Sequence, residues 1–337
     1  MAAGLGFKTF TTGEVLSAGD TNGYLMQGVL VFASAAARDA AITSPQEGQY
    51  AFLKDTDSLT YYTGSAWASA SASASVNLLL NSNFALNQRS YVSAATLTSG
   101  TYGFDRWKSN FATTTLTFTA STQGQSLTIS ASGGLQQVIE QGLVPAGTYT
   151  LSWTGTATGR VYNSGGTPPS YAASPVTFTA DGTANVVVEF TASAATKTVS
   201  KVQFNAGTDT TWRLATPTLA TELSACQRYY FRTPTGLAYQ SYGVGIGSST
   251  TVVFGQVFLP VQMRTAPTVL DYANLAVYDT SAPVTVTSAA LGAGIASTAN
   301  VLQVALTTTS ATLTAFRPYQ ITNANSTSAY IGVGAEL

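Results

Sequence analysis

The 337-residue chain contains 14 Lys and Arg residues, 15 Asp and Glu residues, no histidine and a single cysteine, Cys226. The lack of histidine excludes Ser-His-Asp and Cys-His catalysis and His-containing zinc sites, and one cysteine can form neither an intrachain disulfide nor a thiolate metal site. With a net charge of −1 and no basic stripe, the chain is not expected to bind nucleic acid.

The composition favours β-structure and an assembled state. Charged residues make up only 9% of the chain, against roughly 25% in an ordinary soluble domain, and Ser, Thr, Asn, Gln and Gly supply the polarity instead. Thr, Val and Tyr suit strands, whereas Gly, Asn and Ser suit turns. A surface with so few charges favours an assembly covered by partners or by copies of the chain. The alternative is a monomer kept soluble by hydroxyl groups.

Residues 1–67 predict a small α+β module. Residues 17–20 have the spacing of a capping box and predict a short helix that reaches Met26, and Ser34 can cap a second helix over 35–42. Three strands are predicted, at 29–32, 50–54 and 59–63, and the last two form a hairpin. The N-terminus has no basic segment followed by an apolar run, so no signal peptide is predicted, and no apolar stretch is long enough to insert in a membrane.

A low-complexity tract follows, in which Ala and Ser alternate over residues 68–75. Its composition predicts a flexible linker over 68–76. The alternative uses the period of two, which would place all Ala on one face of a thin strand and all Ser on the other, as suits packing around the axis of a trimer.

Two further β domains are predicted. Residues 77–225 contain short strand-like runs separated by turn signals, which predict a jelly-roll-like antiparallel β-sandwich. These runs are 114–119, 126–130, 135–141, 147–154, 176–179, 185–191, 199–206 and 211–214. Residues 226–337 predict a C-terminal β-sandwich domain. Its runs are 251–259, 268–270, 273–278, 284–287, 301–307, 311–316 and 330–337.

The remaining enzyme class that the composition permits is a glycosidase with a pair of carboxylates. Its candidates in the sandwich are Asp105, Glu140, Asp181, Glu189 and Asp209, and their spacing selects no pair. Asp181 precedes Gly182 and indicates a turn, whereas Glu140 and Glu189 are expected to face solvent from strands. No phosphate-binding loop is present. We therefore expect no enzymatic activity, no cofactor and no metal site.

Three groups of segments carry a family resemblance. They are 7–10, 13–16, 22–26, 37–42 and 53–67; then 77–84, 87–89 and 102–107; then 225–230, 260–268 and 335–337. Together they resemble the fibre and minor tail proteins of tailed bacteriophages. The first group resembles an N-terminal module that faces the virion, the second a carbohydrate-binding-type β-sandwich, and the third the C-terminal domain of the same fibres. Where the sandwiches usually have Gly-Asp, this chain has Ser82-Asn83, which argues against a metal there.

The resemblance implies a homotrimeric virion protein, assembled in the host cytoplasm, that contacts other virion proteins through its N-terminus and a host surface glycan through its β domains. Two alternatives are a capsid or tail decoration protein with a purely structural role and, less favoured, a glycan-degrading tail spike.

Glycan binding needs an aromatic face beside a few polar groups. Tyr102, Arg106 and Trp107 offer these groups, although Trp107 is more easily explained as a core residue. Tyr162 and Tyr171 flank the longest loop-like stretch of the sandwich, and loops often carry function. The alternative for that stretch is an ordinary loop, or one packed on a neighbouring chain. Cys226 is expected to be a buried thiol.

Overall fold

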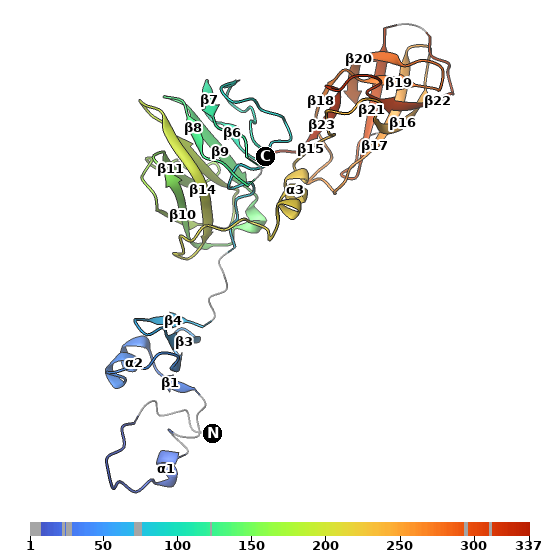
Figure 1. Ribbon diagram of the computed structural model, residues 1–337. Coiled ribbons are helices and arrows are strands. Elements are labelled where there is room, and N and C mark those ends of the chain that lie inside the picture. The colour runs from blue at the N-terminus through green and yellow to red at the C-terminus, as the bar shows by residue number, and fades with distance from the viewer. Residues whose placement is uncertain are drawn as a thin grey trace. The chain divides into compact units, whose positions relative to one another are not determined.

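The computed structural model describes residues 8–21, 24, 29–70, 76–121, 123–292, 296–309 and 312–337. Contacts divide the chain into two units, Met1–Ser75 and Val76–Leu337, and each is described by itself (Figure 1). Most regular structure is β, which confirms the predicted fold class. Some residues on which predictions rest, among them Phe7, Met26 and residues 71–75 of the Ala/Ser tract, lie outside the described residues.

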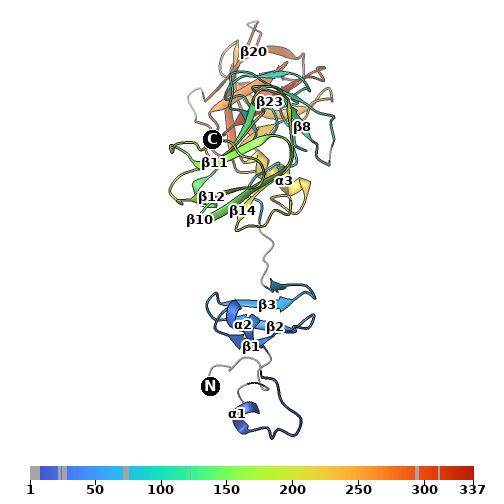
Figure 2. The same ribbon diagram turned by 90° about the vertical axis from the view of Figure 1, so that its left-hand side faces the viewer.

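The first unit is a four-stranded sheet with one helix against it (Figure 2). Its strands lie in the order β1-β2-β3-β4, and β1 is parallel to β2 because the chain crosses between them through the second helix. Ser17 and Ser34 cap the two helices as predicted. The elements are α1 (Ala18–Asp20), β1 (Leu30–Phe32), α2 (Ala35–Ala41), β2 (Tyr50–Leu53), β3 (Ser58–Tyr62) and β4 (Trp67–Ser69). The start of the predicted linker therefore belongs to a strand.

The core of this unit is small. Phe32, Ile42, Ala51 and Leu53 are its buried apolar residues, and Leu30 and Trp67 pack against them. The guanidinium of Arg38 is buried over the ring of Trp67, 4.4 Å from its centroid, and so extends the apolar cluster with a cation–π contact.

The second unit begins with an antiparallel β-sandwich, as predicted. One sheet has the order β12-β10-β14-β8-β7-β5 and the other, here called the small sheet, has the order β11-β13-β9-β6. The strands are β5 (Thr96–Leu97), β6 (Lys108–Ser109), β7 (Thr114–Thr117), β8 (Leu127–Ile129), β9 (Gly134–Ile139), β10 (Gly147–Gly155), β11 (Thr158–Asn163), β12 (Val176–Ala180), β13 (Val186–Thr191) and β14 (Lys197–Ala206). A 3-10 turn, η2 (Gln141–Leu143), follows β9.

Alternation of side chains builds the core between these two sheets. In β13, Val186, Val188 and Phe190 point inward, so the residues between them face the outside of the small sheet. Leu151 of β10 and Phe204 of β14 face them from the other sheet. The predicted strand at 211–214 is wrong, because those residues are irregular. Strand β11 was not predicted, because Gly159 and Arg160 interrupt its apolar pattern.

Helix α3 (Leu219–Gln227) leads from the sandwich to the last domain. Its Glu222 is fully buried and accepts hydrogen bonds from the backbone N–H of Asn81, at 2.6 Å, and from the N–H and hydroxyl of Thr216. The helix is thereby fixed to the sandwich, and the predicted boundary at 225/226 falls inside it. Cys226 is a buried free thiol in this helix, as expected.

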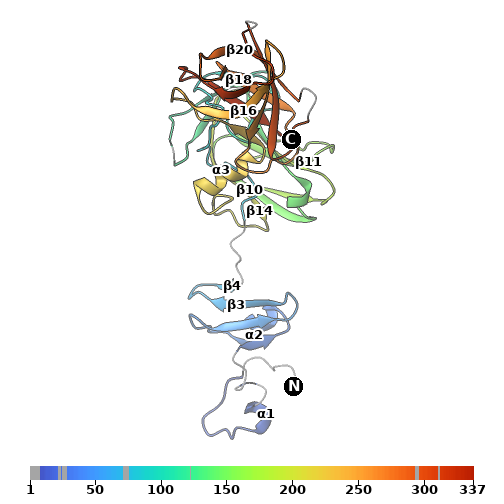
Figure 3. The same ribbon diagram turned by 90° about the vertical axis from the view of Figure 1, so that its right-hand side faces the viewer.

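The C-terminal domain combines a three-stranded sheet with a closed barrel (Figure 3). The sheet has the order β15-β23-β18 and the barrel the order β16-β17-β21-β20-β19-β22, and they share one apolar core. The domain is β as predicted, but one of its layers closes on itself. Its strands are β15 (Tyr230–Arg232), β16 (Ser241–Gly247), β17 (Val252–Phe258), β18 (Val269–Ala273), β19 (Ala276–Tyr278), β20 (Val284–Leu291), β21 (Val301–Thr308), β22 (Pro318–Thr322) and β23 (Tyr330–Gly334).

Three strands of this domain, β15, β16 and β22, were not predicted, and one predicted strand is wrong. Residues 312–316 do not form the predicted strand, and β16 was missed because its glycines gave no apolar alternation. Among the described residues, no helix is long and apolar enough to cross a membrane.

Candidate functional site

A row of polar side chains crosses the outer face of the small sheet. Register places Arg160 of β11 opposite Glu189 of β13, Glu189 opposite Gln136 of β9, and Gln136 opposite Lys108 of β6. Because the inward positions of these strands fill the core, this row lies on the outer face. With strands about 4.8 Å apart, four strands give a face roughly 14 Å wide.

Glu189 is the centre of the row. Its side chain is only 6% exposed and accepts hydrogen bonds from Arg160 Nε at 2.6 Å, Tyr162 Oη at 2.8 Å and Tyr171 Oη at 3.2 Å. A buried carboxylate is stable only when it is paired and hydrogen-bonded, and this one has three donors. The prediction that Glu189 faces solvent is therefore wrong.

The two tyrosines at the ends of the loop meet at this carboxylate. The Arg160 guanidinium lies 4.2 Å from the Tyr171 ring centroid and 5.4 Å from that of Tyr162. Burial, and then the charge of Glu189, raises the pKa of Tyr171 to about 12, and burial with the Glu189 hydrogen bond raises the pKa of Tyr162 as well. Both hydroxyls therefore stay protonated and continue to donate at neutral pH.

The loop between the tyrosines folds back on the sheet. Ala172 pairs with Gly159 across an isolated bridge, and Arg160 Nη1 donates to the backbone oxygen of Pro169. These contacts hold Tyr171 over the outer face. We call Arg160, Tyr162, Tyr171 and Glu189 the tyrosine cluster. It presents two half-buried aromatic rings and one half-buried guanidinium.

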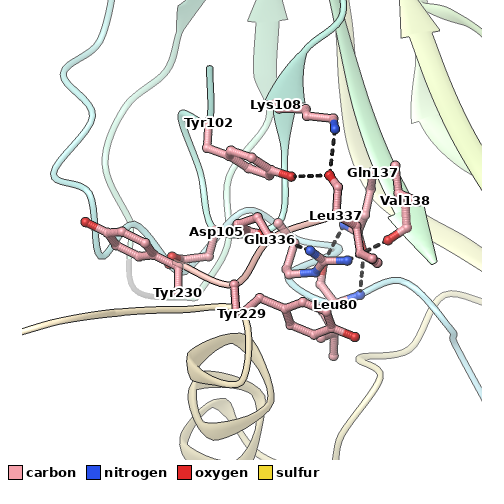
Figure 4. A network of polar contacts seen from close by, with 12 residues as sticks. Leu80, Tyr102, Asp105, Lys108, Gln137, Val138, Tyr229, Tyr230, Glu336 and Leu337 are labelled. Carbon is pink, nitrogen blue, oxygen red and sulfur yellow. Dashed lines mark hydrogen bonds and ion pairs between the residues drawn. The ribbon is translucent and has the colours of Figure 1, made fainter. Parts of the chain in front are cut away.

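The other predicted group lies where the sandwich meets the C-terminal domain (Figure 4). Arg106 is 3% exposed, forms an ion pair with Glu336, donates to the backbone oxygen of Val138 and stacks 3.6 Å from the ring centroid of Tyr229. Tyr102 donates its hydroxyl to the backbone oxygen of Leu337 at 2.9 Å. Both side chains thus hold the chain end against the sandwich, and the close-up shows Tyr102 beside Leu337.

Glu336 is shared by two arginines. Besides Arg106, it pairs with Arg89 Nη2 at 3.1 Å, and the Arg89 guanidinium lies 3.5 Å from the Tyr230 ring centroid. Lys108 donates to the backbone oxygen of Leu337 at 2.7 Å. We call Arg89, Arg106 and Glu336 the junction clamp. It joins residues more than 200 positions apart in the sequence.

Asp105 lies beside this clamp and is almost fully buried. It accepts hydrogen bonds from the backbone N–H and side-chain amide of Gln88, and its nearest guanidinium nitrogen, Arg89 Nη1, is 3.7 Å away. Burial raises the pKa of Asp105 to about 6, against an ordinary 3.8, because these partners do not replace its lost hydration.

Because the folded pKa of Asp105 is raised, its contribution to stability is present below pH 4 and is lost as pH rises through 6. We expect the free energy of unfolding to fall by about 2 kcal/mol from this group between pH 4 and 7. Urea unfolding at pH 4, 5, 6 and 7 measures it. Asp105→Asn should flatten the profile relative to the native chain, and an unchanged slope in this variant would contradict the raised pKa.

Trp107 lies in the sandwich core and is fully buried, as is Phe104. Its ring is not available to a sugar, and the core explanation is correct. Sequence reasoning missed Arg160, Gln136 and Lys108. The charged Glu189 inside the apolar run 186–190 signalled a buried, paired carboxylate, but the sequence did not show its partners.

No protein-family model matches the sequence, and no curated protein matches it. The solved structures that resemble the chain include TmCBM61, solved with β-1,4-galactotriose, at 13% identity and a TM-score of 0.21, covering 39% of this chain and 99% of that one. They also include the CBM22-1–CBM22-2 tandem domain of Paenibacillus barcinonensis Xyn10C, at 10% identity and a TM-score of 0.21, covering 72% and 97%. A Paenibacillus sp. cycloisomaltooligosaccharide glucanotransferase has 10% identity and a TM-score of 0.19, covering 73% and 46%. No conclusion rests on similarities this weak.

Proposed function

We propose that this chain is a virion appendage protein that binds a neutral glycan on the outer face of its small sheet. The observation that carries the glycan part is the tyrosine cluster. Two half-buried tyrosine rings, at the two ends of one loop, are fixed beside one guanidinium on the outer face of the small sheet. A sugar ring stacks its C–H face on such rings while its hydroxyls bond to the neighbouring donors.

The charge of the cluster favours a neutral ligand. Arg160 is neutralised by Glu189 at 2.6 Å, and Glu189 is in turn shielded by both tyrosine hydroxyls. An acidic sugar would compete with Glu189 for the guanidinium. A neutral hydroxyl can instead accept from the guanidinium without breaking this pair. Gln136 adds an amide in the middle of the same face.

The role as an appendage rests on the sequence resemblance to phage fibres, with attachment through the N-terminal unit and a trimeric state. The proposed role involves no catalysis. Asp105, Glu140, Asp181, Glu189 and Asp209 each accept hydrogen bonds from neighbouring residues.

Binding of the full chain to an array of neutral oligosaccharides, followed by calorimetry with the best binder, tests the proposal. Tyr171→Ala should weaken that affinity roughly tenfold, because one stacking face is lost. Tyr171→Phe keeps the ring and should bind nearly as the native chain does. Tyr239→Ala is the matched control, since Tyr239 is exposed on the C-terminal domain.

Two results would overturn the glycan proposal. One is that the native chain binds no neutral glycan of the array. The other is that Tyr171→Ala, folded by circular dichroism, binds as tightly as Tyr239→Ala. Either result would favour the purely structural decoration role instead.

A further inference from the structure

One face of the C-terminal barrel exposes apolar side chains, whereas the opposite side of the same strand carries glycines. In β16, residues 243, 245 and 247 are glycines, whereas the alternate positions are Val244 and Ile246. An added Cβ at Gly243 would meet the backbone oxygen of Gln256 at 2.1 Å, and one at Gly245 that of Phe254 at 2.6 Å. The glycines must therefore stay on the crowded side, and the two β-branched residues point outward.

The neighbouring strand adds aromatic residues to the same face. Register places Phe254 of β17 opposite Ile246, and Gln256 opposite Val244. Val244 and Ile246 are each 57% exposed, Phe254 is 41% exposed and Phe258 is 67% exposed. Phe316, in the turn before β22, is 89% exposed, and its backbone N–H donates to Gly247. These five apolar side chains form what we call the barrel face.

A hollow of about 580 Å³ lies on the barrel face. Val244, Ile246, Phe254 and Phe316 line it together with the amides of Gln256 and Gln303, which are opposite each other in register. None of the described residues that line it is charged. Arg317, the next residue after Phe316, is engaged by Asp279 at 3.2 Å.

Exposing these apolar side chains to water does not stabilise an isolated chain. Fully exposing a large apolar side chain instead of burying it forgoes roughly 1.5–3 kcal/mol, and contiguous apolar patches with a polar rim mark interaction sites. The barrel is closed, so this face has no free strand edge through which a partner strand could add. A partner must therefore bind by side-chain packing.

We propose that the barrel face binds the same face of a second copy of this chain. The features of this surface allow it to pack against an identical surface. An uncharged surface meets its own copy without like-charge repulsion and without burying an unpaired charge. Phe316 is a protruding side chain beside a hollow, so each copy offers both parts of the contact, as closed symmetric assemblies require. A glutamine amide carries both donors and an acceptor, so Gln256 and Gln303 can pair with the same amides of the other copy.

The mass of the full chain in solution, measured by light scattering over a dilution series, tests this proposal. This inference rests on the trimeric state proposed above, so we expect a closed trimer at micromolar concentration. Phe316→Ser should raise the dissociation constant roughly tenfold or more, because an apolar residue at the centre of an interface carries much of the binding energy. Ile246→Lys should dissociate the oligomer further by placing like charges on both faces.

Leu237→Ser is the matched control, because Leu237 is 65% exposed and lies outside the barrel face. It should leave the mass unchanged. A native chain that is monomeric at all concentrations overturns the proposal. So does an oligomer that Phe316→Ser and Ile246→Lys, both shown to be folded by thermal melting, leave intact. If the chain were monomeric and a neutral disaccharide bound saturably beside the Phe316 ring, the hollow would instead be a ligand site.

Discussion

Trp107→Ala is expected to lower the free energy of unfolding of the 76–337 unit by roughly 3–5 kcal/mol, the range for removing a large aromatic side chain from a core. The ring is fully buried, and its centroid lies 5.2 Å from that of Phe84 and 6.0 Å from that of Phe190. Its Nε1–H donates to the backbone oxygen of Asn81 at 3.0 Å. The substitution therefore leaves a cavity and removes one of the two hydrogen bonds to this oxygen, which also accepts from the backbone N–H of Phe84. Chemical unfolding followed by circular dichroism measures the loss.

Trp212→Ala is the control for this experiment. Trp212 is half-buried, donates to Ser82 at 3.3 Å and lies outside the apolar cluster of the sandwich core. Its removal should cost about 1 kcal/mol, mainly from the hydrogen bond. If both substitutions destabilised the unit equally, Trp107 would not be the centre of the core.

Glu336→Gln is expected to destabilise the same unit by about 3 kcal/mol, because it leaves the buried charge of Arg106 without its partner. The side chains of Arg106 and Glu336 are 3% and 12% exposed, so water cannot replace the lost pair. We expect the sandwich and the C-terminal domain of this variant to unfold at different temperatures. Differential scanning calorimetry should show two transitions where the native unit shows one.

The double variant Arg106→Met with Glu336→Gln separates the charge from the packing. Removing both charges should recover part of the stability, since no buried ion then lacks a partner. If the double variant were less stable than Glu336→Gln alone, the stacking of Arg106 on Tyr229 would matter more than the ion pair.

Most of the fold could be predicted because local patterns were strong. The strand-like runs of the sandwich alternate apolar and polar residues, and the caps at Ser17 and Ser34 have unambiguous spacing. The missed strand β16 shows where such reasoning fails. Its glycines are required by the close approach of neighbouring backbone, which a single sequence does not reveal.

The candidate site was only half visible in the sequence. Tyr162 and Tyr171 were found because they bracket a loop, but their meeting point, Glu189, was assigned to solvent. Tyr102 and Arg106 were equally plausible by residue type, and the structure places both at the junction instead. Their partners, Leu337 and Glu336, are 235 and 230 positions away, and no local pattern encodes such a contact.

The long sequence distance between Arg106 and Glu336 sets an order of events during synthesis. A ribosome adds roughly 5–20 residues each second, and domains generally fold as units while the chain emerges. The sandwich can form its core before Glu336 has been made, and Arg106 then has no carboxylate to meet it until the whole C-terminal domain has been produced. The nascent sandwich therefore carries a temporarily unpaired charge, and docking of the finished barrel is the step that neutralises it.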